Sequence, residues 1–160
     1  MIKAKARDFG IVMLVSVALV ALTYFLLRDW RFYGPIVAAM ALLPLFAARL
    51  RGLQLKSLVP DIIFGGVDTG LLTLGAVIGA SEFGIIGAIV GGVVADAITD
   101  AIAGFFEGGV AEWLRSKGIE ESRTALGSAC GKMTGCLAGS GFMLCILQIA
   151  NIQVLNGISP

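Results

Sequence analysis

Histidine is absent from the 160-residue chain, and charged side chains make up only 14% of it. The lack of histidine removes the commonest metal ligand and the usual proton carrier near neutral pH. The charge content is well below the roughly 25% of a soluble domain, so a water-soluble surface cannot be built from it. A net charge of +1 leaves no basic surplus for binding nucleic acid.

The remaining sequence is strongly apolar, with 58% hydrophobic residues and a mean hydropathy of +0.93. Several apolar runs reach the roughly 17–25 residues that a helix needs to cross a bilayer. We therefore predict an all-α integral membrane protein with a single transmembrane domain over residues 1–160. About five transmembrane helices are expected, at residues 9–27, 32–48, 60–80, 83–106 and 124–150.

Lysine and arginine gather in alternate connections between these helices, and this distribution predicts the topology. The three clusters are Lys3, Lys5 and Arg7; Arg49, Arg51 and Lys56; and Arg115, Lys117 and Arg123. With five spans, all three fall on one side, so the N-terminus is expected in the cytoplasm and the C-terminus outside. The first apolar run is too long for a signal peptide and lacks a small-residue cleavage site. We expect a prokaryotic cell membrane, with the lipid bilayer as the surroundings.

Proline and glycine indicate how the apolar segments bend and pair. Pro35 and Pro44 predict a kink in the second helix, because each proline removes a backbone donor. Pro60 is predicted in the first turn of the third helix. The connection over residues 80–84 is very short, so the third and fourth helices should form a glycine-rich antiparallel hairpin at the centre of the chain.

Acidic residues lie inside this hairpin, where each charge costs about 2.5–3.5 kcal/mol at mid-membrane. Asp96 and Asp100 share a helical face, and counting back from a turn near residue 82 places Asp68 opposite residues 96–98. We predict an inner layer that binds and passes a cation, made of the carboxylates Asp68, Asp96 and Asp100 and the hydroxyls Thr69, Thr73 and Thr99. Oxygen ligands suit hard or borderline divalent cations, and adjacent carboxylates suit proton exchange.

Asp61 and Glu107 form a predicted outer pair, nearer the cytoplasm than the inner layer. Two interpretations stay open for them: a secondary cation contact, or simply the ends of helices at the lipid headgroups. For the inner three carboxylates, the alternative is hydrogen bonding between helices without any transport.

The last helix carries glycine at four-residue intervals, at Gly127, Gly131, Gly135 and Gly139. Such a stripe lets another helix approach closely. We expect a homodimer or higher homo-oligomer through it, with packing inside one protomer as the alternative. Lys132 on this helix either extends to the membrane interface or neutralises a carboxylate. The sulfur residues Met133, Cys136, Met143 and Cys145 are interpreted as packing rather than as soft metal ligands.

Two stretches of the hairpin resemble the vacuolar iron transporter family. Gly65-Gly66-Val67-Asp68-Thr69-Gly70-Leu71-Leu72 is similar to the family's first-helix stretch around an aspartate. Residues 94–104, which include Asp96 and Asp100, resemble its second-helix stretch, and the match covers about residues 60–115. The resemblance implies proton-coupled export of Fe²⁺, Mn²⁺ or a similar divalent ion by a homodimer, with Asp68 and Asp96 lining the path.

These observations favour a membrane transporter or channel for a divalent metal cation. The alternative is a non-transporting membrane scaffold or accessory subunit of a larger complex, with its glycine-rich faces packed on partners. An enzyme is not expected, because the sequence offers no histidine, no nucleophile–base pair and no phosphate-binding loop.

Overall fold

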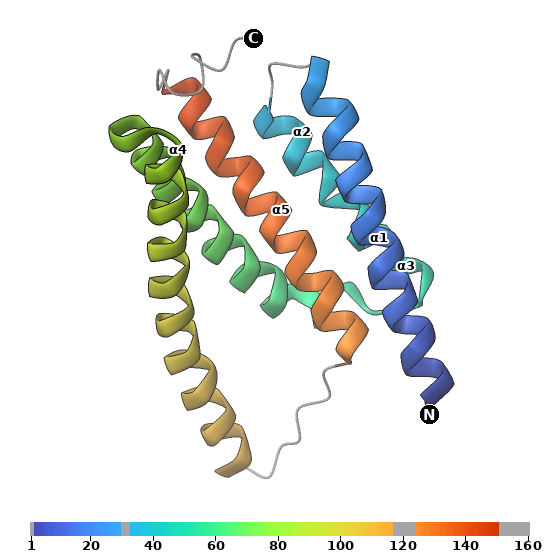
Figure 1. Ribbon diagram of the computed structural model, residues 1–160. Coiled ribbons are helices and arrows are strands. Elements are labelled where there is room, and N and C mark those ends of the chain that lie inside the picture. The colour runs from blue at the N-terminus through green and yellow to red at the C-terminus, as the bar shows by residue number, and fades with distance from the viewer. Residues whose placement is uncertain (1, 30–32, 117–123, 151–160) are drawn as a thin grey trace.

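The computed structural model describes residues 2–29, 33–116 and 124–150, and these residues form helices and no strands (Figure 1). The predicted all-α fold is therefore confirmed. In chain order the elements are α1 (Ile2–Asp29), α2 (Tyr33–Met40), α3 (Leu42–Leu50), α4 (Leu55–Ser116) and α5 (Ala125–Ile149). Helix α5 lies between α4 on one side and α1 and α2 on the other.

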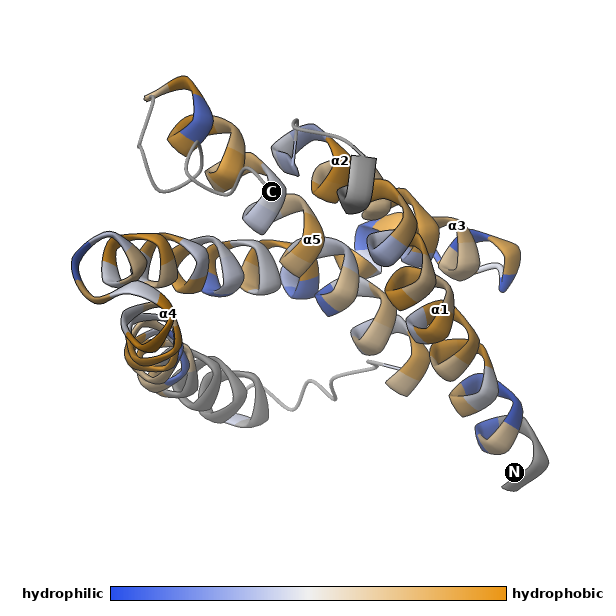
Figure 2. Cartoon of the chain, turned by 45° about the horizontal axis from the view of Figure 1, so that its top comes forward, coloured by the Kyte–Doolittle hydropathy of each residue, from blue (hydrophilic) through white to orange (hydrophobic). Residues whose placement is uncertain are grey.

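Four helical stretches are long and apolar enough to cross a membrane: Lys5–Leu26, Tyr33–Leu50, Leu55–Ala103 and Ala125–Ile149. Hydrophobic residues occur along all of these helices (Figure 2), and many of the large ones are exposed. Ile85 and Ile149, for example, are 81% and 85% exposed. Large exposed apolar side chains of this kind are consistent with helices that cross a membrane.

The second predicted helix is broken into α2 and α3 at Ala41. Pro44 explains the position of the break, because it has no N–H to bond the carbonyl of Met40 and its ring crowds that carbonyl. Pro35 lies in the first turn of α2, where a missing N–H costs nothing. The predicted kink therefore comes from one of the two prolines.

Helix α4 contains the predicted hairpin, with its reversal at Phe83 and Gly84, whose backbone angles are non-helical. We call residues 55–82 the first arm and residues 85–116 the second arm. The first arm begins at Leu55, about one turn before the start predicted at Pro60, so Pro60 lies inside the helix. The second arm extends past the predicted end near residue 106. Figure 1 shows the arms close together at the turn and diverging away from it.

Gly84 makes the reversal possible because its φ of 61° and ψ of −144° fall in a region that is essentially open to glycine alone. A Cβ at this position would meet no atom within 4 Å, so the only cost of a side chain is conformational. We expect Gly84→Ala to lower the free energy of unfolding by roughly 1–3 kcal/mol. Thermal unfolding of the purified protein measures this, and an unchanged midpoint would contradict the strained turn.

The most extensive contact in the described part of the chain is between α4 and α5. A small core of Ala48, Leu58, Leu126 and Cys130 joins α3, the first arm and α5 at one end of the bundle. At the other end, Gln148 Oε1 accepts a hydrogen bond from the backbone N–H of Gly34, at 3.1 Å, which ties α5 to α2.

The glycine stripe of α5 packs against the first arm of the same chain. A Cβ at Gly135 would overlap the carbonyl oxygen of Ile62, and one at Gly139 would overlap that of Gly66. Gly131 lies against the Cβ of Asp61, 2.7 Å from where its own Cβ would be. At these three positions, the glycine stripe that was expected to join two protomers contacts the first arm of the same chain.

Candidate functional site

The two arms of α4 meet backbone to backbone next to their turn. A Cβ at Gly79 would overlap the carbonyl oxygen of Gly87, and a Cβ at Gly91 would overlap that of Gly75. Small residues permit this distance, since any larger side chain would hold the helices apart. The glycine pairs fix the register of the arms and so decide which acidic residues face each other.

Further from the turn than the glycine pairs, a contact between Asp68 and Thr99 connects the two arms. The hydroxyl of Thr99 is in hydrogen-bond contact with Oδ1 of Asp68. The same hydroxyl lies 2.9 Å from the carbonyl oxygen of Asp96 and 3.1 Å from that of Ala95. Because Thr99 has one proton, it donates to one of these oxygens at a time. The register predicted by counting from the turn agrees with this contact.

Asp96 lies close enough to Asp68 and to Asp100 for their negative charges to interact. Asp68 and Asp96 are half-buried, whereas Asp100 is exposed on the outer side of the second arm. Of the three carboxylates predicted as an inner layer, two are thus half-buried and one is exposed. The Thr99 hydroxyl contacts the carboxylate of Asp68 but only the backbone carbonyl oxygen of Asp96.

The two remaining threonines of the predicted layer lie on the face of the first arm that turns toward α5. Thr73 donates to the carbonyl oxygen of Thr69, at 2.7 Å, and its hydroxyl contacts that of Ser140 on α5. Thr73 is buried, and Thr69 is half-buried. Ser140 was not among the residues selected from the sequence, and its place on the glycine-rich helix is the signal that could have identified it.

Asp61 faces α5 rather than the second arm, and it is only 2% exposed. Its Oδ2 accepts a hydrogen bond from the hydroxyl of Ser128, at 3.0 Å. The arms have diverged at this level, while the glycines of α5 bring that helix against the first arm (Figure 1). The predicted partner, Glu107, belongs to the second arm, and its side chain lies outside the described residues.

Lys132 of α5 places its Nζ 4.9 Å from the centre of the Phe64 ring, in a cation–π contact. It is exposed, and its charge therefore rests on an aromatic face instead of a carboxylate in the described structure. Cys136 packs beside Gly65, 3.2 Å from where a Cβ of that glycine would lie, in agreement with a packing role.

The chemistry available in the hairpin is that of oxygen ligands alone. Within the described residues no three carboxylate or thiol side chains converge on one point to hold a metal ion. Asp68, Asp96 and the Thr99 hydroxyl offer fewer protein ligands than the six to eight of a tight calcium site.

Comparison of the chain with protein-family models, with curated proteins and with solved structures gives no match.

Proposed function

We propose that the chain is an integral membrane protein of about five transmembrane helices. Four apolar helical stretches support this, and the longest of them, Leu55–Ala103, reverses at Phe83 and Gly84 and so supplies two crossings. The apolar outer surfaces of the helices agree with a lipid surrounding. The proposal includes a cytoplasmic N-terminus and an external C-terminus, on the ground that lysine and arginine gather in alternate connections.

The α4 hairpin, in this proposal, carries a divalent metal cation across the membrane, with protons moving on the same carboxylates. The observation that supports it is the contact between Thr99 and Asp68 across the two arms, directly beside Asp96. Keeping two carboxylates at membrane depth costs about 5–7 kcal/mol, a sum comparable to the net stability of a small domain. A cation or proton that binds there offsets that cost.

Ion flux into proteoliposomes tests the proposal. The purified full chain is reconstituted, and uptake of Fe²⁺ and of Mn²⁺ is followed with an enclosed metal-sensitive dye, with and without a pH gradient. We expect uptake above that of protein-free vesicles, and faster uptake in one direction of the gradient. Uptake equal to that of protein-free vesicles, for both ions and both gradients, would refute transport.

A non-transporting scaffold is the second candidate, and the exterior of the second arm favours it. Its large side chains Ile85, Ile86, Ile89, Val93 and Ile98 are exposed. Among the positions of this arm whose burial is described, those that are buried are Gly87, Gly92 and Thr99. A partner protein, or a further copy of this chain, would find an open apolar helix there. Stoichiometric co-purification of a partner, together with unchanged behaviour after Asp→Asn substitution, would distinguish the scaffold from the transporter.

A further inference from the structure

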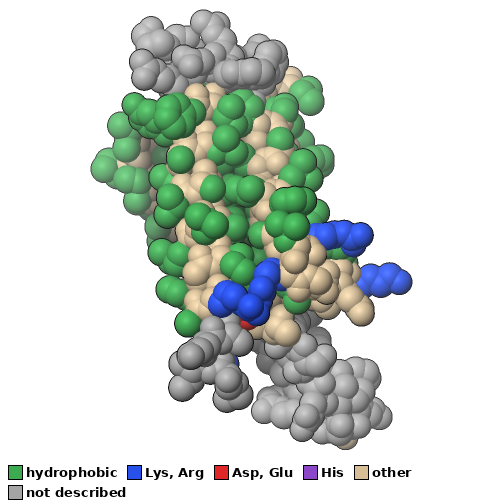
Figure 3. Space-filling model, turned by 90° about the vertical axis from the view of Figure 1, so that its right-hand side faces the viewer, with side chains coloured by type: hydrophobic (Ala, Val, Ile, Leu, Met, Phe, Trp, Pro, Cys, Tyr) green, Lys and Arg blue, Asp and Glu red, His purple; other side chains and the backbone are tan. Residues whose placement is uncertain are grey.

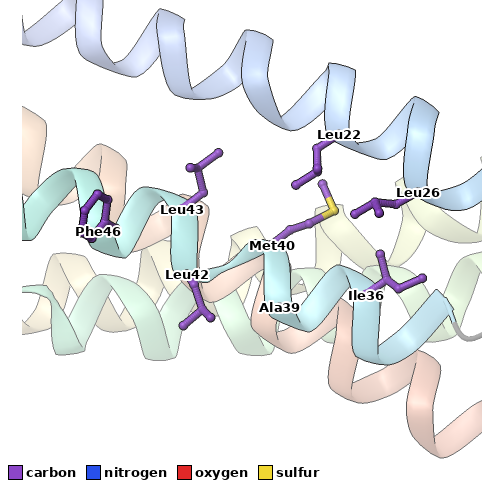
Figure 4. A pocket seen from close by; sticks show the side chains of 8 residues that line it. All are labelled: Leu22, Leu26, Ile36, Ala39, Met40, Leu42, Leu43 and Phe46. Atoms are coloured by element: carbon purple, nitrogen blue, oxygen red, sulfur yellow. The ribbon is translucent and has the colours of Figure 1, made fainter.

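An apolar groove of about 510 Å³ runs between α1 and the broken helix pair α2–α3. Its walls include Leu22 and Leu26 of α1, Ile36 and Met40 of α2, and Leu43 and Phe46 of α3. Figure 4 shows Leu22 and Leu26 pointing toward Met40, with Phe46 at the far end of the row. The volume lies within the roughly 300–1,000 Å³ typical of small-molecule sites, and the lining is apolar throughout.

Basic side chains lie beyond the Phe46 end of this groove. Arg49 follows Phe46 by one turn of α3 and is exposed, and Arg51 comes directly after the helix. On α1, Lys5 is exposed one turn before Asp8. Figure 3 shows Lys and Arg side chains gathered at one level of this face, with hydrophobic side chains above them.

One carboxylate is present among these cations. Oδ1 of Asp8 lies 2.8 Å from Nη2 of Arg51, and this ion pair joins the start of α1 to the end of α3. The Nε atom of Arg51 is buried and has no hydrogen-bond partner among the described residues. Asp8 therefore balances one charge, and the exposed Lys5, Arg7 and Arg49 leave a positive excess at this end of α1 and α3. Of these three, Arg49 follows the groove residue Phe46 by one turn.

We propose that this groove and its basic end bind one anionic phospholipid. A single acyl chain lies along the groove between α1 and α2–α3, and the phosphate rests on Arg49 and Lys5. This inference requires the proposed membrane location but not the proposed transport. A phospholipid fits because it joins a flexible apolar chain to an anionic headgroup. In the same order, the apolar groove is followed by basic side chains at one end.

The basic end of the groove also predicts a preference for an anionic phospholipid over a zwitterionic one. Cations next to the membrane attract anionic headgroups, and removing one of them weakens binding by about fivefold. A zwitterionic phosphatidylcholine would fill the groove equally well but would gain little from the basic end. Preference between the two headgroups is therefore the property that tests the site.

Native mass spectrometry of the full chain, purified in a mild detergent, counts the lipids that it retains. The delipidated protein is titrated with phosphatidylglycerol or phosphatidylcholine of the same acyl chains. We expect one phosphatidylglycerol per chain, retained at least fivefold more strongly than phosphatidylcholine. Ala39→Phe, which places a ring in the groove, should remove this bound lipid, and Arg49→Gln should weaken its retention by about fivefold.

Two matched variants act as controls. Ala21→Phe adds the same ring at an exposed position of α1 that does not line the groove, and Lys132→Gln removes a cation from α5. Both should keep the bound phosphatidylglycerol. Arg49→Gln changes an exposed side chain, so it tests the site even if Ala39→Phe does not fold. Equal retention of both lipids by the wild-type protein, or unchanged retention in Arg49→Gln, would overturn the proposal.

The lipid site and the transport path are tested separately. Asp68→Asn alters the α4 hairpin, which shares no residue with the groove, and it should retain phosphatidylglycerol as the wild-type protein does. A chain that binds the lipid but passes no cation would contradict only the transport proposal.

Discussion

Replacing Asp68 by asparagine is expected to lower divalent-cation flux in proteoliposomes by roughly 10–100-fold, the range found when a group that supports a metal site is removed. Asparagine has the same shape and can still accept the Thr99 hydroxyl contact, so the arms of α4 should keep their register. Only the charge is lost. Asp96→Asn is expected to act in the same direction, because Asp96 lies beside Asp68 and shares its electrostatic environment.

Although these variants should lose flux, their free energy of unfolding should stay the same or rise. A carboxylate at membrane depth costs about 2.5–3.5 kcal/mol, and a neutral amide removes part of that cost. We therefore expect Asp68→Asn to unfold at the same temperature as the wild-type protein or at a higher one, which shows that the lost flux is not lost folding. Glu82→Gln is the matched control, since Glu82 is exposed at the hairpin turn and should leave flux unchanged. Full flux in both aspartate variants would sink the transport proposal.

Gly135→Ala is expected to lower the stability of the protein, because this glycine of α5 lies at backbone distance from the first arm. The new Cβ would overlap the carbonyl oxygen of Ile62 and lie 2.9 Å from the backbone nitrogen of Gly66. Both atoms belong to the backbone of the first arm and cannot rotate away, so α5 must move as a unit. Overpacking of this kind typically costs about 1–3 kcal/mol. Thermal unfolding in detergent should show a midpoint lower by several degrees.

Gly10→Ala provides the matched control for this loss. Gly10 is in α1, and a Cβ there would meet nothing within 4 Å. Alanine is the better helix former by about 1 kcal/mol, so this variant should be slightly more stable than the wild-type protein. If both substitutions raise the midpoint, then α5 does not pack on the first arm at backbone distance, and the described α4–α5 interface is wrong.

The helices could be predicted because length and hydrophobicity are local properties. The apolar runs predicted the main helical segments, and Pro35 and Pro44 together predicted a kink in the second one. The structure assigns the break to Pro44. The start of the third helix was harder to predict. Pro60 suits a first turn, but nothing local prevents one more turn before it, and the helix extends back to Leu55.

The part of the candidate site that lies between the two arms of α4 could be predicted, because it depends only on the register of the hairpin. Two helices joined by a short turn face each other residue by residue, so counting from the turn placed Asp68 opposite residues 96–98. The structure has Asp68 in contact with Thr99, one residue further along. Helix α5 is separated from α4 by a longer connection, and its crossing depends on which glycine faces which carbonyl. The contacts of Asp61 with Ser128 and of Thr73 with Ser140 were therefore not predicted.

The burial of Asp61 also bears on how the chain is made. Ribosomes synthesise α4 before α5, so the first arm exists before the Ser128 hydroxyl that donates to its carboxylate. The close packing of the α5 glycines on the first arm likewise forms only after the last helix has been made. The surroundings of Asp61 are therefore completed late in synthesis, when α5 reaches the first arm.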